Sequence, residues 1–266
     1  MKTIAENAND FAEIRTADKG NCIYVDKTDY FHRLVTDGRR KLFFIARPRR
    51  FGKSLMITTF KYIFEGRREL FNGLKIDKTD YDWKVHPVIH LNFGLCARST
   101  HADFMREMPA IVKSAIDKSG YAYDEKKVPT VNFLNAIEWH FAQGTPCVVL
   151  IDEYDDPVAR ALANPAEAEQ IREELAGFYG KIKDRTHMIR FLMITGVSKF
   201  TKMSVTCQRS GCSTRRATSR SRTTRTATTP WAFPTKKCAA NWLFRHKCGS
   251  ENGRPPYPRR PRRVAW

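Results

Sequence analysis

Four short apolar runs recur along the first three quarters of the chain, each bounded by polar or turn-forming residues. They contain few polar positions and are rich in β-branched and aromatic side chains. Continuous runs of this length are typical of strands that are buried on both faces, as in parallel sheets. We therefore predict four parallel strands, at residues 42–46, 88–93, 147–152 and 191–196.

Longer segments with helix-like spacing of their apolar positions lie between these runs, at residues 53–65, 101–118, 131–143 and about 165–182. Upstream of the first run, residues 24–35 read as a short strand end followed by a helix that leads into the sheet. Strands that alternate with helices in this rhythm predict an α/β fold, with a parallel sheet covered by helices on both faces.

The formal net charge of +19 is unevenly distributed. Residues 206–266 hold 15 Lys and Arg and a single acid, Glu251, whereas residues 1–205 hold 32 basic and 27 acidic residues. The first 205 residues therefore resemble an ordinary, mildly basic globular domain. The remainder shows neither a helical nor a strand period, and it holds four of the seven Cys and three of the five Trp.

Composition also excludes several classes of protein. No stretch approaches the roughly 18 consecutive apolar residues of a membrane helix, and residues 1–15 contain no apolar signal-peptide core. Seven cysteines, an odd number at irregular spacings, argue against a secreted disulfide scaffold. We therefore expect a soluble, cytoplasmic protein without a membrane partner.

The sharpest local signal is the motif RPRRFGKS, which lies between the first apolar run and the following helix. Phosphate-binding loops use backbone N–H groups at a helix N-terminus, a Lys that reaches the outer phosphates and a Ser or Thr hydroxyl on Mg²⁺. Gly52, Lys53 and Ser54 supply this set, although Arg47 stands where the usual motif has Gly. A positive φ at Arg47 would be strained, so the loop is either bent differently or under strain. The candidate nucleotide-binding residues are Arg47, Pro48, Arg49, Arg50, Phe51, Gly52, Lys53 and Ser54.

The third apolar run ends in a pair of acids, Asp152 and Glu153. At the carboxyl edge of a parallel sheet, Asp152 would hold Mg²⁺ together with Ser54, and Glu153 would orient the water that attacks the γ-phosphate. In nucleotide sites, the strand between the one with the loop and the one with the acid pair ends in a polar side chain near the γ-phosphate. Thr195 is the candidate for that position, with a turn that binds no ligand as the alternative.

These motifs resemble the bacterial AAA-ATPase-like family. The resemblance rests on RPRRFGKSL, on VDKT upstream and on LIDEYDDP and ITGVSKF downstream, and it covers about residues 14–205. It implies a P-loop NTPase-type sheet, ATP and Mg²⁺ as ligands, residues 47–54 as the nucleotide loop, and Asp152 and Glu153 as the acid pair. Members carry Arg where other loops carry Gly, and many are followed by a restriction-endonuclease-like nuclease domain.

Beyond SKFTKMSV the family pattern stops abruptly. Read one frame over, the codons for residues 231–238 permit Gly-Phe-Ser-Asp-Glu-Glu-Val-Arg, which resembles the stretch that the family carries next. We interpret residues 1–205 as a P-loop domain truncated after its fourth strand, and residues 206–266 as a disordered, frameshifted basic tail. The alternative is a basic arm that contacts nucleic-acid phosphates, with Trp or Tyr stacked on bases.

Two functions therefore remain open for the first 205 residues. One is an ATPase in which Mg²⁺-dependent hydrolysis drives a change in an unknown partner. The other is a nucleotide-binding module or inactive remnant, because truncation after the fourth strand would remove parts of a complete site. A nucleic-acid-binding protein is a third hypothesis, which rests on the tail. The sequence predicts neither the partner nor the oligomeric state.

Overall fold

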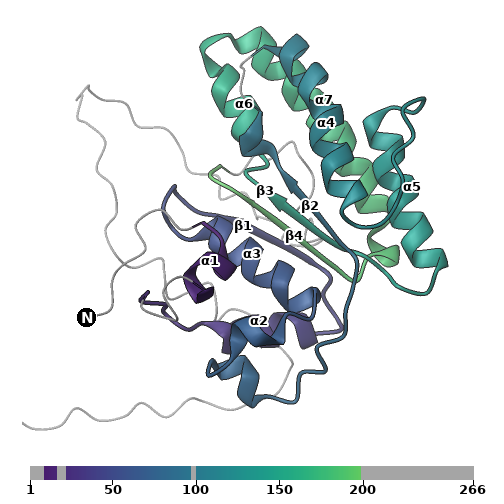
Figure 1. The fold of residues 1–266 in the computed structure, drawn as a ribbon. Coiled ribbons are helices and arrows are strands. Elements are labelled where there is room, and N and C mark those ends of the chain that lie inside the picture. Colours follow the sequence, from purple (N-terminus) through teal and green to yellow (C-terminus); the bar gives the residue numbers. More distant parts are fainter. Residues whose placement is uncertain (1–8, 17–21, 97–99, 199–266) are drawn as a thin grey trace, which may run out of the picture. The chain divides into compact units, whose positions relative to one another are not determined.

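The computed structural model describes residues 9–16, 22–96 and 100–198 (Figure 1). All of them belong to one compact unit, Met1–Gly211, and a second unit comprises Cys212–Trp266. The predictions for residues 206–266, a disordered and frameshifted basic tail, lie outside the described residues. The same holds for the prediction that the sheet is incomplete after its fourth strand.

The four predicted strands form one parallel sheet in the order β1-β4-β3-β2. Their bounds are Leu42–Ala46 for β1, Val88–Asn92 for β2, Val148–Asp152 for β3 and Phe191–Gly196 for β4. The α/β class and the parallel sheet predicted from the sequence are thus confirmed. β4, the last strand in sequence, lies between β1 and β3.

Alternate residues of the central strands contribute to two separate cores. Leu150 and Met193 lie in a core on one face of the sheet, whereas Val149, Ile151 and Leu192 lie in a core on the other. All residues of β3 and β4 are buried, which accounts for their unbroken apolar sequences. β1 is partly buried along its length, as expected for a strand at the edge of the sheet.

The core on one face of the sheet includes residues from the helices of the N-terminal part of the chain. These are α1 (Phe11–Thr16), α2 (Thr28–Thr36) and α3 (Lys53–Phe64), with 3₁₀ turns at Arg68–Phe71 and Lys75–Lys78. Phe60 and Phe64 of α3 pack on Phe191 of β4, with ring centroids 5.0 and 5.1 Å apart. Burial of each such side chain stabilises the fold by about 1.5–3 kcal/mol.

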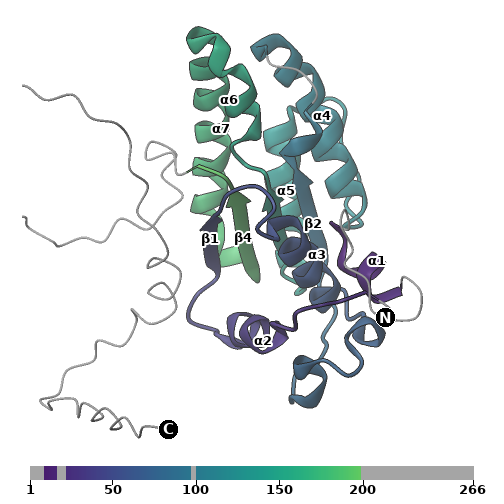
Figure 2. The same ribbon diagram turned by 90° about the vertical axis from the view of Figure 1, so that its left-hand side faces the viewer.

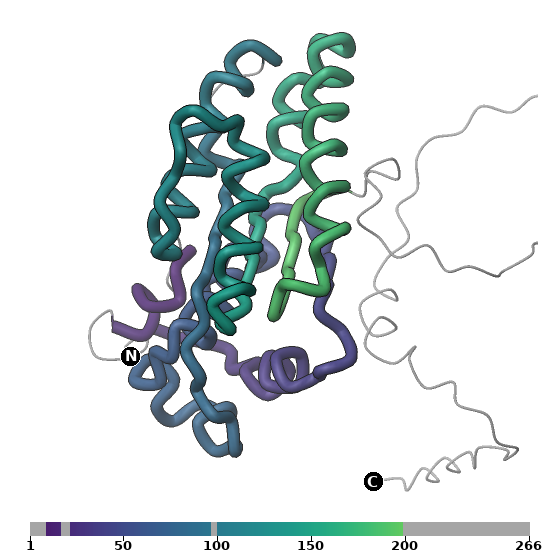
Figure 3. The backbone as a smooth tube through the Cα atoms, turned by 90° about the vertical axis from the view of Figure 1, so that its right-hand side faces the viewer, coloured from purple at the N-terminus to yellow at the C-terminus, as the bar shows by residue number. Residues whose placement is uncertain are grey.

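The opposite face is covered by three longer helices, α4 (His101–Asp117), α5 (Pro129–Ala142) and α7 (Pro165–Asp184) (Figures 1 and 2). Figure 3 shows them from their own side of the sheet. Shorter elements are α6 (Asp156–Arg160) and 3₁₀ turns at Phe93–Leu95, Ala161–Ala163 and Thr186–Met188. Helices on both faces confirm the predicted layers. Within the described part of the chain, no helix is both long and apolar enough to cross a membrane.

Helix boundaries follow capping chemistry more closely than hydrophobic spacing. The Thr100 side chain accepts a hydrogen bond from the Asp103 N–H at the start of α4, and Asn164 does the same for Ala166 at the start of α7. α5 begins two residues earlier than predicted because Pro129 suits the first turn of a helix.

The strand end that we expected at Tyr24 is wrong. Residues 23–27 have no regular secondary structure, and the helix begins at Thr28. The Asp26 carboxylate accepts hydrogen bonds from the Thr28 N–H and hydroxyl, at 2.9 and 2.6 Å, and so forms a local turn instead of pairing in the sheet. α1 and α6, with six and five residues, were not predicted.

Candidate functional site

The carboxyl edge of the sheet gathers the segments that the sequence singled out. The parallel register places Ala46 beside Gly196 and Asn92 beside Asp152, so all four strands end at this edge. The loop of residues 47–52, the acid pair and Thr195 therefore lie at neighbouring strand ends, although they are far apart in the sequence. Such an edge is where open α/β sheets bind ligands.

The loop between β1 and α3 takes its sharp bends at two positions. Arg50 has φ 65° and Gly52 has φ 72°, whereas Arg47 is not among the described residues with positive φ. The left-handed conformation costs a non-glycine residue about 1–2 kcal/mol, so the strain falls on Arg50. The Arg47 N–H donates to the Gly196 carbonyl at 3.0 Å, which ties the loop to β4. The loop is thus bent differently from one that needs Gly at its head.

Lys53 is the first residue of α3, and its side chain is only 4% exposed. Its Nζ lies 3.4 Å from Glu153 Oε1 and also donates to the Pro48 carbonyl at 3.4 Å. Burial raises the pKa of Glu153, while the nearby Lys53 charge acts in the opposite direction. Glu153 itself has φ 52°, a strained conformation directly after β3. The candidate loop cation and the candidate water-orienting acid are therefore ion-paired.

Asp152 and Thr195 contact each other across β3 and β4. The Thr195 hydroxyl donates a 2.5 Å hydrogen bond to Asp152 Oδ1, and the Glu153 N–H donates to the same oxygen at 3.0 Å. Asp152 is 1% exposed and Thr195 is fully buried. Among the described residues, none donates a hydrogen bond to Asp152 Oδ2. One carboxylate oxygen is thus fixed in place while the other remains available to a cation.

The rest of the nucleotide loop is exposed. Arg47, Pro48, Arg49, Arg50, Phe51 and Gly52 all face solvent, and Ser54 is half-buried. Arg49 Nη2 lies 3.3 Å from Asp156 Oδ1, so the middle of the loop is tied to the start of α6. Phe51 is an exposed aromatic side chain beside the helix N-terminus.

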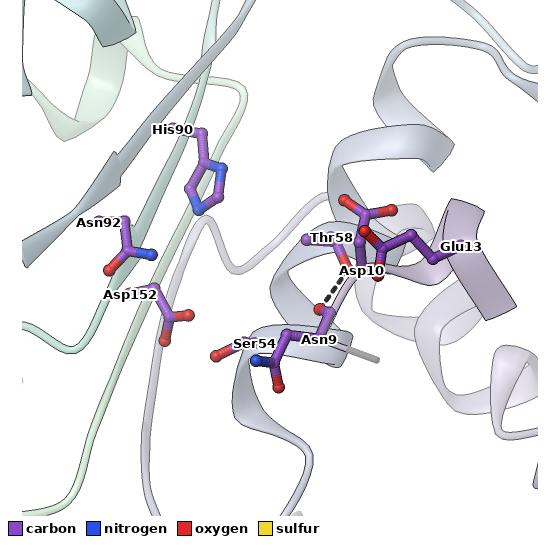
Figure 4. Close-up of a pocket in the computed structure, with 8 residues that line it drawn as sticks. All are labelled: Asn9, Asp10, Glu13, Ser54, Thr58, His90, Asn92 and Asp152. Carbon is purple, nitrogen blue, oxygen red and sulfur yellow. Dashed lines mark hydrogen bonds between the residues drawn. The ribbon is translucent and has the colours of Figure 1, made fainter. Parts of the chain in front are cut away.

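A polar pocket of about 300 Å³ lies next to Asp152 (Figure 4). His90, Asn92 and Asp152 lie on one side of it, and Ser54, Thr58 and the N-terminal residues Asn9, Asp10 and Glu13 lie across from them. The Thr58 hydroxyl accepts a 3.0 Å hydrogen bond from the Phe11 N–H, which holds α1 on α3. Sequence reasoning missed this wall of the pocket, because a six-residue helix is too short to show a period.

The pocket fits a hydrated magnesium ion bound together with phosphate. Mg²⁺ takes one or two carboxylates plus substrate phosphates and keeps several waters, rather than using an all-protein cage. Among the described residues, no group of three or more His, Cys, Asp or Glu side chains is placed to hold a metal alone. Ser54 and Asp152 both line the pocket, and the buried His90 Nε2 has no hydrogen-bond partner among the described residues. A cation-bound water would satisfy that nitrogen.

A further set of contacts joins the segments that follow β3 and β4. The Asp155 carboxylate accepts hydrogen bonds from the Val197 N–H at 3.0 Å and the Ser198 N–H at 2.5 Å, and the Tyr154 hydroxyl donates to the Ser198 carbonyl at 2.8 Å. Gly196 passes so close to Tyr154 and Asp155 that no side chain fits there. The sequence shows these residues within LIDEYDDP and ITGVSKF, but only the fold reveals that the two motifs bind each other.

Comparison with known proteins identifies the family of the chain. The family model described as "Predicted AAA-ATPase" matches residues 7–206, about three quarters of the chain. A protein of Azotobacter chroococcum mcd 1, named "Uncharacterized protein in vnfD 5'region", is 36% identical over 197 residues, or 73% of this chain. The chain spans 37% of the length of that relative. No solved structure matches the chain. With its motifs assembled at one edge of a parallel α/β sheet, the chain belongs to the predicted AAA-ATPase family.

Proposed function

We propose that the chain binds ATP with Mg²⁺ at the carboxyl edge of its sheet and hydrolyses the γ-phosphate. One observation carries the proposal. The buried Lys53 ammonium at the start of α3 lies 3.4 Å from Glu153, directly beside Asp152. A cation and a helix N-terminus that bind phosphate, an acid that holds Mg²⁺ and a group that positions water are recurring parts of sites for phosphoryl transfer to water.

The loop supplies the phosphate contacts. The first backbone N–H groups of the 12-residue helix α3 have no acceptor within the helix, and the helix dipole adds a partial positive charge at this end. Lys53 adds a full charge, and its side chain is shielded from water, which strengthens its attraction for a phosphate. Since Lys53 is paired with Glu153, a phosphate that binds the ammonium competes with that carboxylate.

Ser54 and Asp152 are the residues that would hold Mg²⁺. Both line the polar pocket, and Asp152 keeps one oxygen free of hydrogen bonds from the described residues. When bound, Mg²⁺ neutralises phosphate charge and polarises the γ-phosphate. Thr195 fixes the Asp152 carboxylate through its 2.5 Å hydrogen bond. We therefore propose that Thr195 orients the metal ligand, in addition to lying near the γ-phosphate as expected from the sequence.

Glu153 would act on the attacking water. A carboxylate whose pKa is raised by burial is a better proton acceptor than an ordinary Glu, provided that it remains ionised. In this role Glu153 orients the water and takes its proton as the oxygen attacks the γ-phosphorus. The bond to the bridging oxygen then breaks, which gives ADP and inorganic phosphate.

The contacts between the segments after β3 and β4 offer a route from the site to a partner. Asp155 and Tyr154, directly after the acid pair, hold Val197 and Ser198 through three hydrogen bonds. A shift of Glu153 on nucleotide binding would therefore also move Val197 and Ser198, which follow β4. We propose that this segment transmits the nucleotide state to a partner.

We further propose that residues 206–266 take no part in the nucleotide site and that the protein acts in the cytosol. The family match ends at residue 206, where the composition changes, which supports the first point. Every residue assigned to the site precedes residue 199. A chain that ends at residue 205 should bind ATP as tightly as the full chain, and weaker binding would contradict this assignment.

Glu153→Gln separates binding from hydrolysis. The amide cannot accept the proton, so phosphate release should fall about 100-fold or more while Mg²⁺-dependent ATP binding is retained. Glu65→Gln is the matched control, because Glu65 is also paired with a lysine of α3, Lys61, at the opposite end of that helix. Unchanged turnover in the Glu153 variant would contradict the proposed role. ATP binding without turnover in the parent chain would favour the binding-module alternative.

A further inference from the structure

Two cations of the nucleotide loop are each held by a carboxylate from the segment after β3. Lys53 Nζ lies 3.4 Å from Glu153 Oε1, and Arg49 Nη2 lies 3.3 Å from Asp156 Oδ1. Asp156 follows Glu153 by one turn, since its N–H donates to the Glu153 carbonyl at 3.0 Å. The loop is thus joined to this segment by two neighbouring ion pairs.

The two pairs differ in how easily they can open. The Lys53 side chain is buried, whereas the Arg49 side chain is 74% exposed, so its pairing with Asp156 is weakened by solvent. Asp156 is only 6% exposed, but it does not depend on Arg49 alone. Arg160, one turn later on α6, pairs with its other carboxylate oxygen and also donates to the Gly94 carbonyl. Arg49 can therefore move away from Asp156 without leaving that buried carboxylate unpaired, because Arg160 still pairs with it.

Arg49 differs from the other arginines of the loop. Among the described residues, no carboxylate lies within ion-pair distance of Arg47 or Arg50, which project from the same exposed loop. Among the described arginines of the loop, Arg49 alone forms an ion pair with the segment that carries Glu153, the residue proposed to act at the γ-phosphate. A guanidinium binds phosphate oxygens with two parallel hydrogen bonds, which makes it a strong and geometrically selective partner for a terminal phosphate.

We propose that Arg49 distinguishes nucleoside triphosphate from diphosphate, by exchanging Asp156 for an oxygen of the γ-phosphate. The inference rests on the proposed function and adds a specificity-determining residue to it. In the diphosphate state the guanidinium stays with Asp156, because nothing replaces that carboxylate. In the triphosphate state the loop loses its ion pair with Asp156 of α6, which links the identity of the nucleotide to the position of that helix.

The test compares a triphosphate analogue with a diphosphate on the full chain. The dissociation constants of Mg²⁺–AMP-PNP, which is not hydrolysed, and of ADP are measured by calorimetry for the parent and for Arg49→Gln. Loss of a charged bidentate contact should weaken AMP-PNP binding about tenfold or more, with ADP binding changed less than about twofold. Arg49→Lys keeps the positive charge but cannot form two parallel hydrogen bonds. Its affinity for AMP-PNP should therefore lie between those of the parent and of Arg49→Gln. Arg39→Gln, at an exposed arginine outside the nucleotide loop, is the control and should leave the ratio of the two constants unchanged.

The outcomes separate this inference from the proposed function. Equal weakening of both ligands by Arg49→Gln, or no weakening of either, would overturn the role of Arg49 while leaving nucleotide binding intact. A change of the ratio by Arg39→Gln equal to that of Arg49→Gln would show a general charge effect and would also overturn the role of Arg49. If the parent chain binds neither ligand, the proposed function fails and this inference fails with it. Circular dichroism spectra of the variants establish that each is folded.

Discussion

Lys53 Nζ lies 3.4 Å from Glu153 Oε1, so the cation that begins α3 and the acid that follows β3 neutralise each other inside the site. The pair joins two motifs that are a hundred residues apart in the sequence. Under the proposed function, a phosphate that binds Lys53 would compete with Glu153. Binding of the substrate and release of the water-orienting carboxylate would then be one event.

The charge of Asp152 should govern the magnesium dependence of binding. Asp152→Asn keeps an oxygen that can accept the Thr195 hydrogen bond but removes the negative charge that attracts a cation. We expect the Mg²⁺ concentration required for half-maximal ATP binding to rise about tenfold or more. A titration with Mg²⁺ at fixed ATP measures it. Asp80→Asn, at a fully exposed side chain, is the control, and an unchanged midpoint in the Asp152 variant would remove Asp152 from the metal site.

Gly196 should tolerate no side chain. A Cβ at this position would lie 2.3 Å from Asp155 Oδ1 and 2.4 Å from Tyr154 Cδ1, and both groups are buried. Gly196→Ala should therefore lower the free energy of unfolding by about 1–3 kcal/mol, as overpacking does. Gly177→Ala in α7 is the control, since its Cβ would meet nothing within 4 Å. That change should leave stability equal or up to about 1 kcal/mol higher. Urea denaturation of both variants measures these changes. Equal stability of Gly196→Ala and the parent would contradict the close packing of Gly196 against Tyr154 and Asp155.

Stability should fall in mild acid, in part because of His140. Its ring is buried, with Nε2 3.1 Å from the Ser119 hydroxyl, and burial lowers the pKa. Below about pH 6.5, His140 binds a proton more readily in the unfolded chain than in the folded chain. The free energy of unfolding therefore decreases as the pH falls. His86 and His90, whose pKa values are also lowered by burial, add to this dependence.

His140→Gln should reduce the slope of unfolding free energy against pH between about pH 5 and 6.5, by up to about 1.4 kcal/mol per pH unit. Urea denaturation at a series of pH values measures the slope, irrespective of any change in absolute stability. His187→Gln, at an exposed position, serves as the control and should leave the slope unchanged. A slope that is the same in the parent and the His140 variant would contradict the prediction.

Strands and motifs were predictable because their signals are local. A strand that is buried on both faces must be apolar throughout. The apolar runs at residues 148–151 and 191–194 therefore predict β3 and β4. The loop and the acid pair follow from their position directly after such strands. The expectation that Thr195 lies on a strand between the other two was also met, since β4 pairs with both β1 and β3.

The remaining features depend on contacts between distant segments. The strained φ falls on Arg50 instead of Arg47, because the hydrogen bond from the Arg47 N–H to Gly196 fixes the head of the loop in an ordinary conformation. α1 is too short to show a period, and its place beside the pocket is set by Thr58, 47 residues from its hydrogen-bond donor Phe11. Asp155 carries no signal that separates it from its acidic neighbours until the fold brings Val197 to it.

The affinity of ATP for Lys53→Ala, compared with the parent, tests the account most directly. Calorimetry with ATP and excess Mg²⁺ gives both constants, and Lys61→Ala, on the same helix but paired with Glu65, is the control. Loss of a buried charge on the phosphates should weaken ATP binding about 100-fold or more, while the control stays within about twofold of the parent. A folded Lys53→Ala chain that binds ATP as tightly as the parent would contradict the assignment of the nucleotide site.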